Sequence, residues 1–291
     1  MPSTRDIRRR IKSVKNTAQI TKAMQMVAAS KMRRAQQAAL AGRPYTELMN
    51  HVLLQVTGRV GDFKHPLMES HSTGKRAVIV ISSDKGLAGA LNSNLLREAG
   101  RLDKATVFIT AGRKASQFAA RTKRNLAAEF TYKDSPTFAE ARAISKFAQE
   151  LFLKGEVDGV DILYTRYFST LVQKPELRPL LPLTDLKPLT VNNQAVPTEP
   201  RDMGTESEFK FEPDVATVLG GLLPHYVNFM VFQILLEAKA SEQSARMVAM
   251  KNATDNAKQL IKDLTLEYNK LRQANITKEL LEITSAAMAM S

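Results

Sequence analysis

The turn after the first apolar run in the middle of the chain is the segment most like a ligand-binding loop. Residues 82–91 read SSDKGLAGAL, with two glycines three residues apart after a run of β-branched residues. Such a loop can present backbone amides to a phosphate at the start of a helix. The spacing matches neither the G-x-G-x-x-G triplet nor the G-x-x-x-x-G-K-[ST] pattern. We therefore expect a tight strand-to-helix turn, capped by Ser83 or Asp84, with Lys85 at its tip.

Other catalytic patterns are weak or absent from the sequence. The chain has no cysteine, which excludes disulfides, thiolate metal sites and cysteine nucleophiles. The four histidines form no H-E-x-x-H pair and fall in separate segments. Glu279 and Glu282 stand three residues apart on one helical face, a spacing more typical of a solvated edge than of an acid/base pair. We predict no catalytic residue, no metal site and no cofactor.

The net charge is unevenly distributed. The 291 residues carry a net charge of +13, and residues 1–34, with ten basic side chains and one acidic one, hold +9 of it. Such a segment attracts an acidic partner, which can be nucleic acid, a membrane surface or a protein. Residues 1–44 contain no aromatic side chain on which bases could stack, although single-strand binding usually uses them. A basic coiled-coil nucleic-acid-binding protein remains the alternative.

Residues 1–58 form the first predicted segment, a long helix. Ser3 or Thr4 can cap it, and apolar residues then recur in steps of three and four. Gly42 and Pro44 mark a kink. The expected apolar seam consists of Ile7, Ile11, Val14, Ala18, Ile20, Met24 and Val27.

Residues 75–191 change to an α/β pattern. Three short β-branched runs, Ala77–Ile81, Ala105–Thr110 and Val160–Thr165, read as buried strands. Helical stretches alternate with them, which favours a mostly parallel, Rossmann-like sheet with helices on its faces. The predicted helices are Leu91–Leu102, Arg113–Arg121 and Thr137–Leu153. Residues 192–212 are expected to form a loop.

Residues 213–291 read as a second long helix, broken near Gly220, Gly221 and Pro224. No proline or glycine follows Pro224, and an unbroken helix of that length would extend ~100 Å. No run approaches the ~18–20 uninterrupted apolar residues of a membrane span, and no secretory signal or transit peptide is recognised. The fold class is therefore α/β with long helices, in which the terminal helices form an antiparallel coiled coil around an inserted α/β domain. The expected second seam runs through Ile261, Leu264, Tyr268, Leu271, Ile276, Leu280, Ile283, Ala287 and Met290, with a stutter near 271–276.

Specific strings resemble a known family. Residues 20–35 (ITKAMQMVAASKMRRA) and 43–45 (RPY) closely resemble the N-terminal helix of the gamma subunit of F-type ATP synthases. Residues 241–257 (SEQSARMVAMKNATDNA) and 268–283 (YNKLRQANITKELLEI) resemble its C-terminal helix, and residues 83–92 resemble its first α/β loop. Ala286 departs from the family, which usually has glycine there. The regulatory insert of chloroplast relatives is also missing, so the chain resembles the bacterial type.

The resemblance implies a central rotor stalk with no active site of its own. The helices would turn inside a ring of alpha and beta subunits, and the α/β domain would lie near the epsilon subunit and the c-ring. The protein would be peripheral to the cytoplasmic face of the bacterial inner membrane, reached only through the c-ring, and would bind no nucleic acid. An α/β enzyme with a phosphate loop at 83–92 is a further alternative.

The resemblance and the charge pattern also suggest contact residues. Contacts to the ring subunits are expected from basic, polar and apolar residues of the two helices: Lys12, Lys22, Met24, Arg33, Arg34, Arg246, Arg272, Gln273, Thr277 and Glu279. Contacts to epsilon or the c-ring are expected from Arg43, Tyr45, Asp84, Lys85 and Gly86.

Overall fold

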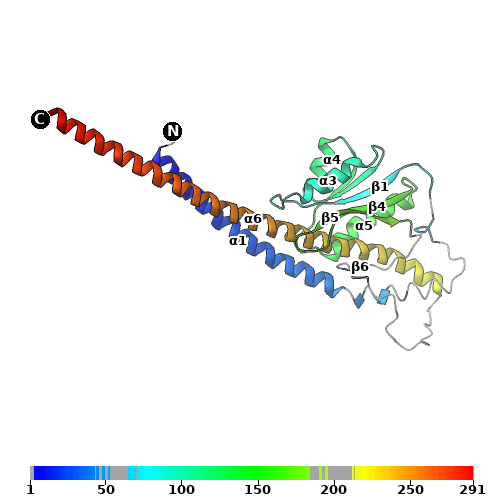
Figure 1. Cartoon of the computed structure of the whole chain (residues 1–291). Helices are drawn as coiled ribbons and strands as arrows, with labels where there is room; N and C mark the ends of the chain where they lie inside the picture. Colours follow the sequence, from blue (N-terminus) through cyan, green and yellow to red (C-terminus); the bar gives the residue numbers. More distant parts are fainter. Residues whose placement is uncertain are drawn as a thin grey trace. The chain divides into compact units, whose positions relative to one another are not determined.

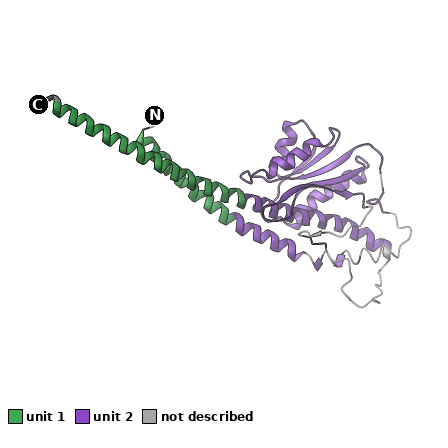
Figure 2. Cartoon of the chain, in the orientation of Figure 1, with its two compact units in different colours: residues 1–27, 247–291 green, residues 28–246 purple. Residues whose placement is uncertain are grey.

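The computed structural model (Figure 1) describes residues 3–42, 44–45, 48–49, 52, 65–69, 71–183, 190–191, 194–195, 212 and 214–290. The chain divides into two compact units. Residues 1–27 and 247–291 form unit 1, and residues 28–246 form unit 2 (Figure 2). Helices α1 (Thr4–Ala41) and α6 (Val215–Met290) contribute to both units. Arg43 lies outside the described residues.

Unit 1 is an antiparallel pair of helical segments from α1 and α6. The Ser3 hydroxyl accepts the Asp6 amide at 3.2 Å, so Ser3 caps α1 as predicted. The least exposed positions then recur in steps of four and three, as in a coiled-coil seam. Along α1 they are Ile7, Ile11, Val14, Ala18, Thr21 and Gln25, and along α6 they are Met250, Thr254, Ala257, Ile261, Leu264, Tyr268 and Leu271.

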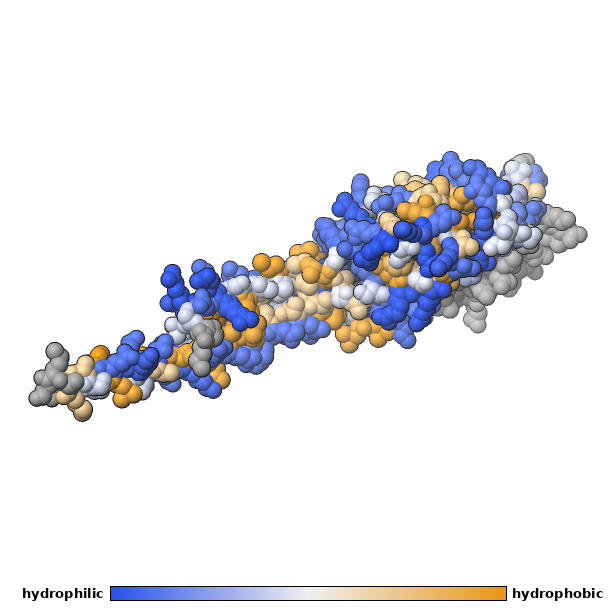
Figure 3. Space-filling model, turned by 90° about the horizontal axis from the view of Figure 1, so that it is seen from above, coloured by the Kyte–Doolittle hydropathy of each residue, from blue (hydrophilic) through white to orange (hydrophobic). Residues whose placement is uncertain are grey.

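Two details of the predicted seams are wrong. Ile20 and Val27 are 60% and 54% exposed, because the heptad spacing from Ile7 passes through Thr21 instead. On α6, the expected seam residues from Ile276 to Ala287 are also exposed, with Ile283 at 66%. The Thr21–Thr254 pairing sets the register, so α1 begins opposite Leu271 and no partner segment from α1 remains for the last turns of α6. Figure 3 shows apolar patches among hydrophilic residues on this part of the chain.

Unit 2 contains a five-stranded sheet of order β3-β2-β1-β4-β5. Strands β1 to β4 are parallel, and β5 pairs with β4 antiparallel. The strands are β1 (Arg76–Ile81), β2 (Val107–Ala111), β3 (Asn125–Phe130), β4 (Gly159–Tyr167) and β5 (Gln173–Leu181). The connecting helices are α3 (Leu91–Arg101), α4 (Arg113–Arg121) and α5 (Phe138–Leu153).

The sheet has a hydrophobic core on each face. Alternate β1 residues Val78 and Val80 pack with α3 and α4 on one face. Ala77, Ile79 and Ile81 pack with α5 and the first part of α6 on the other, and Figure 1 shows the helices in these two layers. The predicted α/β class with long terminal helices is confirmed.

Helix α6 runs without a break through Pro224, so the predicted interruption is wrong. The proline removes one backbone hydrogen bond of the helix and crowds the carbonyl of Gly220, four positions earlier. The buried face of this stretch, which includes Leu219, Leu223 and Val227, compensates for the lost backbone bond. An 18-residue window of α6 reaches a mean hydropathy of 1.4, but 56% of it is buried, as in the core helix of a globular protein.

Two strands of the sheet were not predicted. Strand β3 (NLAAEF) lacks a β-branched run and alternates between exposed and half-buried residues. Strand β5 contains Pro175 and Pro179, and its edge position tolerates residues without an amide hydrogen. Within the expected loop 192–212, Gln194–Ala195 (β7) pairs with Thr190–Val191 (β6), and of the rest only Glu212 is described.

Candidate functional site

The carboxyl edge of the parallel strands is where open α/β sheets usually bind ligands. The chain connects β1, β2 and β3 in one direction and then places β4 on the opposite side of β1. A crevice is expected at this switch point, outside the ends of β1 and β4. In unit 2, side chains and a helix occupy this place.

Ser82 fills the first part of the edge. Its hydroxyl accepts the amide of Ala115 at 2.8 Å and donates to the carbonyl of Gly112 at 3.2 Å. Its carbonyl accepts the Tyr132 hydroxyl at 2.9 Å. Gly112 has φ +100°, and a Cβ there would lie 2.1 Å from the Ser82 carbonyl oxygen. The amides at the start of α4 therefore face protein groups, not an open anion site.

The loop between β1 and α3 is held by its own polar groups. The Ser83 hydroxyl donates to the Lys85 carbonyl at 2.7 Å, and the Asn92 side-chain amide donates back to that hydroxyl at 2.8 Å. Asp84 accepts the amide of Arg113 at 3.0 Å, at the start of α4. The prediction that Ser83 or Asp84 caps the following helix is wrong, because the N-cap position is Ala90 and these side chains are engaged elsewhere.

A polar stretch of α6 fills the rest of the crevice. Glu237 accepts the amide of Tyr167, at the end of β4, at 3.2 Å. Ser244 donates to the carbonyl of Thr170 at 3.0 Å. Six polar residues of this stretch are buried: Lys239, Ser241, Glu242, Gln243, Ser244 and Arg246.

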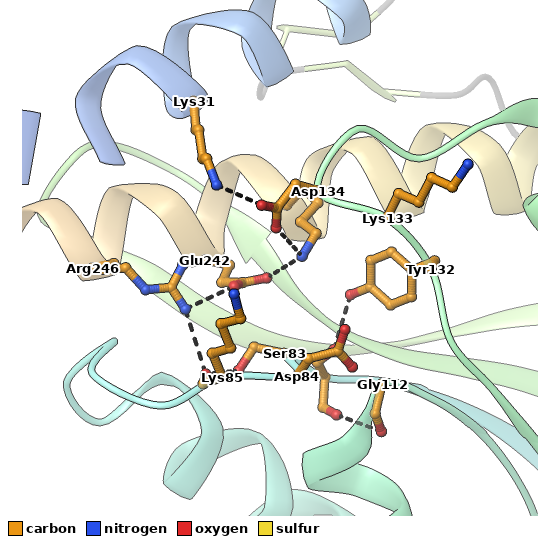
Figure 4. Close-up of polar contacts among 12 residues, drawn as sticks. Lys31, Ser83, Asp84, Lys85, Gly112, Tyr132, Lys133, Asp134, Glu242 and Arg246 are labelled. Atoms are coloured by element: carbon orange, nitrogen blue, oxygen red, sulfur yellow. Dashed lines mark hydrogen bonds and ion pairs between the residues drawn. The ribbon is translucent and has the colours of Figure 1, made fainter. Parts of the chain in front are cut away.

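Five charged side chains form a continuous ion chain in unit 2 (Figure 4). Lys31 of α1 pairs with Asp134, in the turn after β3. The other Asp134 oxygen lies 3.5 Å from the Lys239 ammonium, which also contacts Glu242 at 2.8 Å. Glu242 in turn pairs with Arg246 at 2.8 Å. We call Lys31, Asp134, Lys239, Glu242 and Arg246 the ion chain.

Arg246 ends the ion chain on the loop after β1. Its guanidinium group lies 3.4 Å from the Lys85 carbonyl oxygen and 3.3 Å from that of Gly86. Arg246 was expected to contact a partner subunit, but it is buried and bound to groups of its own chain. In this structure Arg246 therefore makes an internal contact between α6 and the loop.

The environment shifts three ionisation equilibria at this edge. The hydrogen bond from Lys31, helped by Lys239, lowers the pKa of Asp134. Burial raises the pKa of Tyr132 well above its ordinary value. Burial also raises the pKa of Glu237 to about 7. The described residues contain no group of three His, Asp or Glu side chains placed to hold a metal ion.

Sequence comparison decides the family. A sequence model of the family described as ATP synthase matches residues 3–290. The chain is 50% identical over 291 residues to the ATP synthase gamma chain of Opitutus terrae, with 99% of each chain covered. It is 45% identical over 296 residues to that of Methylacidiphilum infernorum, with all of each chain covered. The chain belongs to the ATP synthase gamma chain family.

Solved structures agree with this assignment. One match is a chain in the structure of the central stalk and c-ring of the Tetrahymena thermophila mitochondrial ATP synthase. The match covers 80% of this gamma-family chain and 99% of the Tetrahymena chain, with a TM-score of 0.58 and 26% identity. A chain of the Euglena gracilis mitochondrial ATP synthase superposes with a TM-score of 0.67, and the match covers 99% of this chain and 94% of the Euglena chain. At 22% sequence identity this match supports the fold alone. These matches give no support to the nucleic-acid alternative.

The shaft residues singled out from the gamma-family strings lie mostly on exposed surface. Met24 is half-buried beside the seam of unit 1, and the hydroxyl of Thr277 donates to the carbonyl of Gln273 at 3.0 Å. The exposed side chains are Lys12, Lys22, Arg33, Arg34, Arg272, Gln273, Thr277 and Glu279.

The expected foot residues fall in two places of unit 2. The Tyr45 hydroxyl lies 2.7 Å from His225 Nε2, and its ring centroid lies 4.7 Å from that of Phe229. Burial raises the pKa of Tyr45. Asp84, Lys85 and Gly86 belong to the loop that Arg246 contacts.

Sequence reasoning missed most of the ion chain in this gamma-family member. Lys31, Asp134, Lys239 and Glu242 were not proposed as site residues. One local signal was available, since Lys239, Glu242 and Arg246 follow one another in steps of three and four on one helical face. Asp134 lies more than 100 residues from Lys239 and could be found only from the fold.

Proposed function

We propose that this chain is the central rotor subunit of a proton-translocating F-type ATP synthase. It couples rotation of the c-ring to conformational cycling of the catalytic beta subunits. The observation that carries the proposal is the match to gamma chains over the whole length of the sequence. The central-stalk match supports the same reading.

The structure of unit 1 suits a shaft. Two helices with a regular seam resist bending and twisting better than one, because each seam side chain is held by the facing helix. Beyond Leu271 the last part of α6 exposes Ile276, Leu280 and Ile283. Soluble proteins rarely leave an apolar stripe uncovered, so we propose that the ring of alpha and beta subunits surrounds this part.

Rotation can act on the ring only through unequal contacts. A shaft shifts a conformational equilibrium when, at each angle, it binds one arrangement of the ring better than the others. Residues 1–34, which include the exposed cations Lys12, Lys22, Arg33 and Arg34, hold +9 of the net charge of +13, so most of the positive charge lies on α1. We propose that these cations and Arg272 meet acidic surfaces of the beta subunits, with Gln273, Thr277 and Glu279 as polar contacts and Met24 as a support of the shaft.

The subunit is proposed to be non-catalytic. The crevice in which an α/β enzyme would bind its ligand is filled by Ser82, Tyr132 and the polar stretch of α6. This argues against nucleotide binding at residues 83–92. ATP chemistry would then belong to the ring, and this chain would transmit mechanical work.

The α/β domain is proposed to face the epsilon subunit and the c-ring, with contacts from Tyr45 and from residues 84–86. Arg43, which lies outside the described residues, is proposed as a further contact on the basis of its position in the sequence. The protein is then peripheral at the cytoplasmic face of the bacterial inner membrane, which it reaches only through the c-ring.

Assembly with purified alpha and beta subunits tests the proposal. We expect the chain to co-purify with them and to make ATP hydrolysis drive proton pumping once the remaining subunits and membranes that hold the complete proton-translocating sector are added. Salt-sensitive DNA binding without ring binding would contradict the proposal.

A charge-reversal pair tests the basic face. Lys22→Glu is expected to lower coupled pumping, whereas Lys104→Glu, the same change at an exposed position of the α/β domain, leaves it near wild type. Equal effects of the two substitutions would refute a specific role for the α1 cations.

A further inference from the structure

Lys239 is an unusually buried cation. Its side chain is 3% exposed. Its ammonium group lies 2.8 Å from one Glu242 oxygen, 3.5 Å from one Asp134 oxygen and 4.9 Å from the centre of the Tyr132 ring. Lysine is almost never buried so fully unless it is paired, so this position is defined by its partners.

Each carboxylate of the ion chain is shared between two cations. Glu242 uses Oε2 for Lys239 and Oε1 for Arg246. Asp134 uses Oδ1 for Lys239 and Oδ2 for Lys31. Lys239 therefore connects two ion pairs that would otherwise be separate. Through them it links α1, the turn after β3 and α6 to the loop after β1, as Figure 4 shows.

The loop that receives Arg246 contains a residue in an unfavourable backbone conformation, beyond the part that Ser83 and Asn92 hold. Lys85, Gly86 and Leu87 are exposed, and Leu87 has φ +63°. A left-handed backbone is unfavourable for a bulky branched residue and persists only where the surroundings hold it. The Arg246 contacts to the Lys85 and Gly86 carbonyl oxygens lie next to this residue.

We propose that Lys239 is a positioning residue for this loop. By holding Asp134 and Glu242 together, it fixes the direction of the Glu242 carboxylate, and that carboxylate holds Arg246 against the loop. The loop is then fixed against α6, so that it moves together with this helix when the helix rotates. The positioning itself is a property of the free chain, and only its consequence for coupling rests on the proposed rotor function.

Limited trypsin digestion of the full-length chain tests the positioning. Cleavage after Lys85 requires the loop to open, and its rate follows the open population when reclosing is fast. In Lys239→Met, cleavage at Lys85 should be about tenfold faster than in wild type, the scale expected when a charged hydrogen bond is lost. Cleavage after Lys123, an exposed turn residue away from the ion chain, is the internal control and should not change.

Asp134→Asn provides a second, milder variant because the Asp134 side chain is 52% exposed, and it should show the same selective increase. Glu129→Gln, the same chemical change at an exposed position of β3, is the matched control. Equal cleavage rates at Lys85 in wild type and both variants would overturn the proposal. A parallel increase at Lys85 and Lys123 would also overturn it, since it would show a general loss of stability.

Proton pumping per ATP hydrolysed, measured in the reconstituted complex, tests the consequence. At equal assembly, Lys239→Met and Asp134→Asn should lower this ratio and Glu129→Gln should not. Faster cleavage after Lys85 alone, with no change in the number of protons pumped per ATP hydrolysed, would overturn the role of the loop in coupling. Failure of the wild-type chain to support any coupled pumping would refute the proposed rotor function and leave the cleavage result to decide the positioning.

Discussion

The hydroxyl groups of Thr21 and Thr254 lie 2.7 Å apart in the seam of unit 1, 233 residues apart in sequence. Both side chains are buried, and each hydroxyl also contacts a backbone carbonyl of its own helix. A polar pair at one level of an otherwise apolar seam favours the register in which the two hydroxyls meet, because any shift leaves both without that partner. This pair therefore sets which turns of α1 face which turns of α6.

Replacing the two threonines with valine, which has nearly the same shape, tests the pair. Thr21→Val and Thr254→Val should each lower the free energy of unfolding by ~1 kcal/mol. The double variant should cost less than the sum, because the second substitution removes a bond that is already lost. Urea unfolding of the four proteins gives the coupling energy, and strict additivity would mean that the hydroxyls do not interact.

Leu264 tests the seam itself. It is 6% exposed, whereas Leu266, two residues further along α6, is 58% exposed. Leu264→Asp buries an unpaired carboxylate and should destabilise unit 1 by several kcal/mol and impair assembly. Leu266→Asp should stay within about 0.5 kcal/mol of wild type. Thermal unfolding checks both, and similar losses in the two variants would place the seam elsewhere.

Gly112 should tolerate no side chain. A Cβ would lie 2.1 Å from the Ser82 carbonyl oxygen, and φ is +100°. Gly112→Ala should therefore lower the free energy of unfolding by ~1–3 kcal/mol, through backbone strain and displacement of Ser82. The control is Gly100→Ala in helix α3, where the nearest atom lies at an ordinary 3.8 Å and alanine should be neutral or stabilising. A stable Gly112→Ala protein would contradict the close approach.

Glu237 should make stability depend on pH. Burial raises its pKa from 4.5 to about 7, so the folded chain binds this proton more tightly than the unfolded chain does. The resulting stabilisation is full below pH ~4.5 and is lost as the pH rises through 7. The Tyr167 amide donates to the carboxyl group, and the charges of Arg166 and Arg178 act on its pKa in the opposite direction to that of Glu176.

Glu237→Gln should remove this dependence. Relative to the variant, wild type should lose about 3 kcal/mol of unfolding free energy between pH 4.5 and 8. Glu267→Gln, at an exposed position of the same helix, should leave the wild-type pH profile unchanged. Urea unfolding at several pH values provides the comparison, and parallel profiles for wild type and Glu237→Gln would contradict the assignment.

The sequence predicts best those strands that are buried on both faces of the sheet, because such strands contain continuous apolar, β-branched runs. Strands β1, β2 and β4 lie inside the sheet and appear as β-branched runs, so they could be predicted. Strands β3 and β5 lie at the edges, where one side is open, and their composition is not distinctive. The seam of α1 passes through Thr21 and not through the more hydrophobic Ile20, because packing against α6 follows the regular steps of four and three.

The ion chain could be predicted only in part. The spacing of Lys239, Glu242 and Arg246 along α6 was visible, but their burial was not, because three charged residues on a helix usually mark a solvated face. Burial depends on the carboxyl edge of the sheet and on Asp134, which the fold brings to Lys239 from a distant part of the sequence. The internal contact of Arg246 was not predicted for the same reason.

Direct observation of rotation tests the central claim. The chain has no cysteine, so Lys104→Cys on the exposed surface of the α/β domain provides a unique attachment point for a bead. With the alpha and beta subunits fixed to a surface and ATP supplied, the account predicts stepwise rotation of the bead in one direction. A bead that stays still while the same assembled ring hydrolyses ATP would contradict the rotor function.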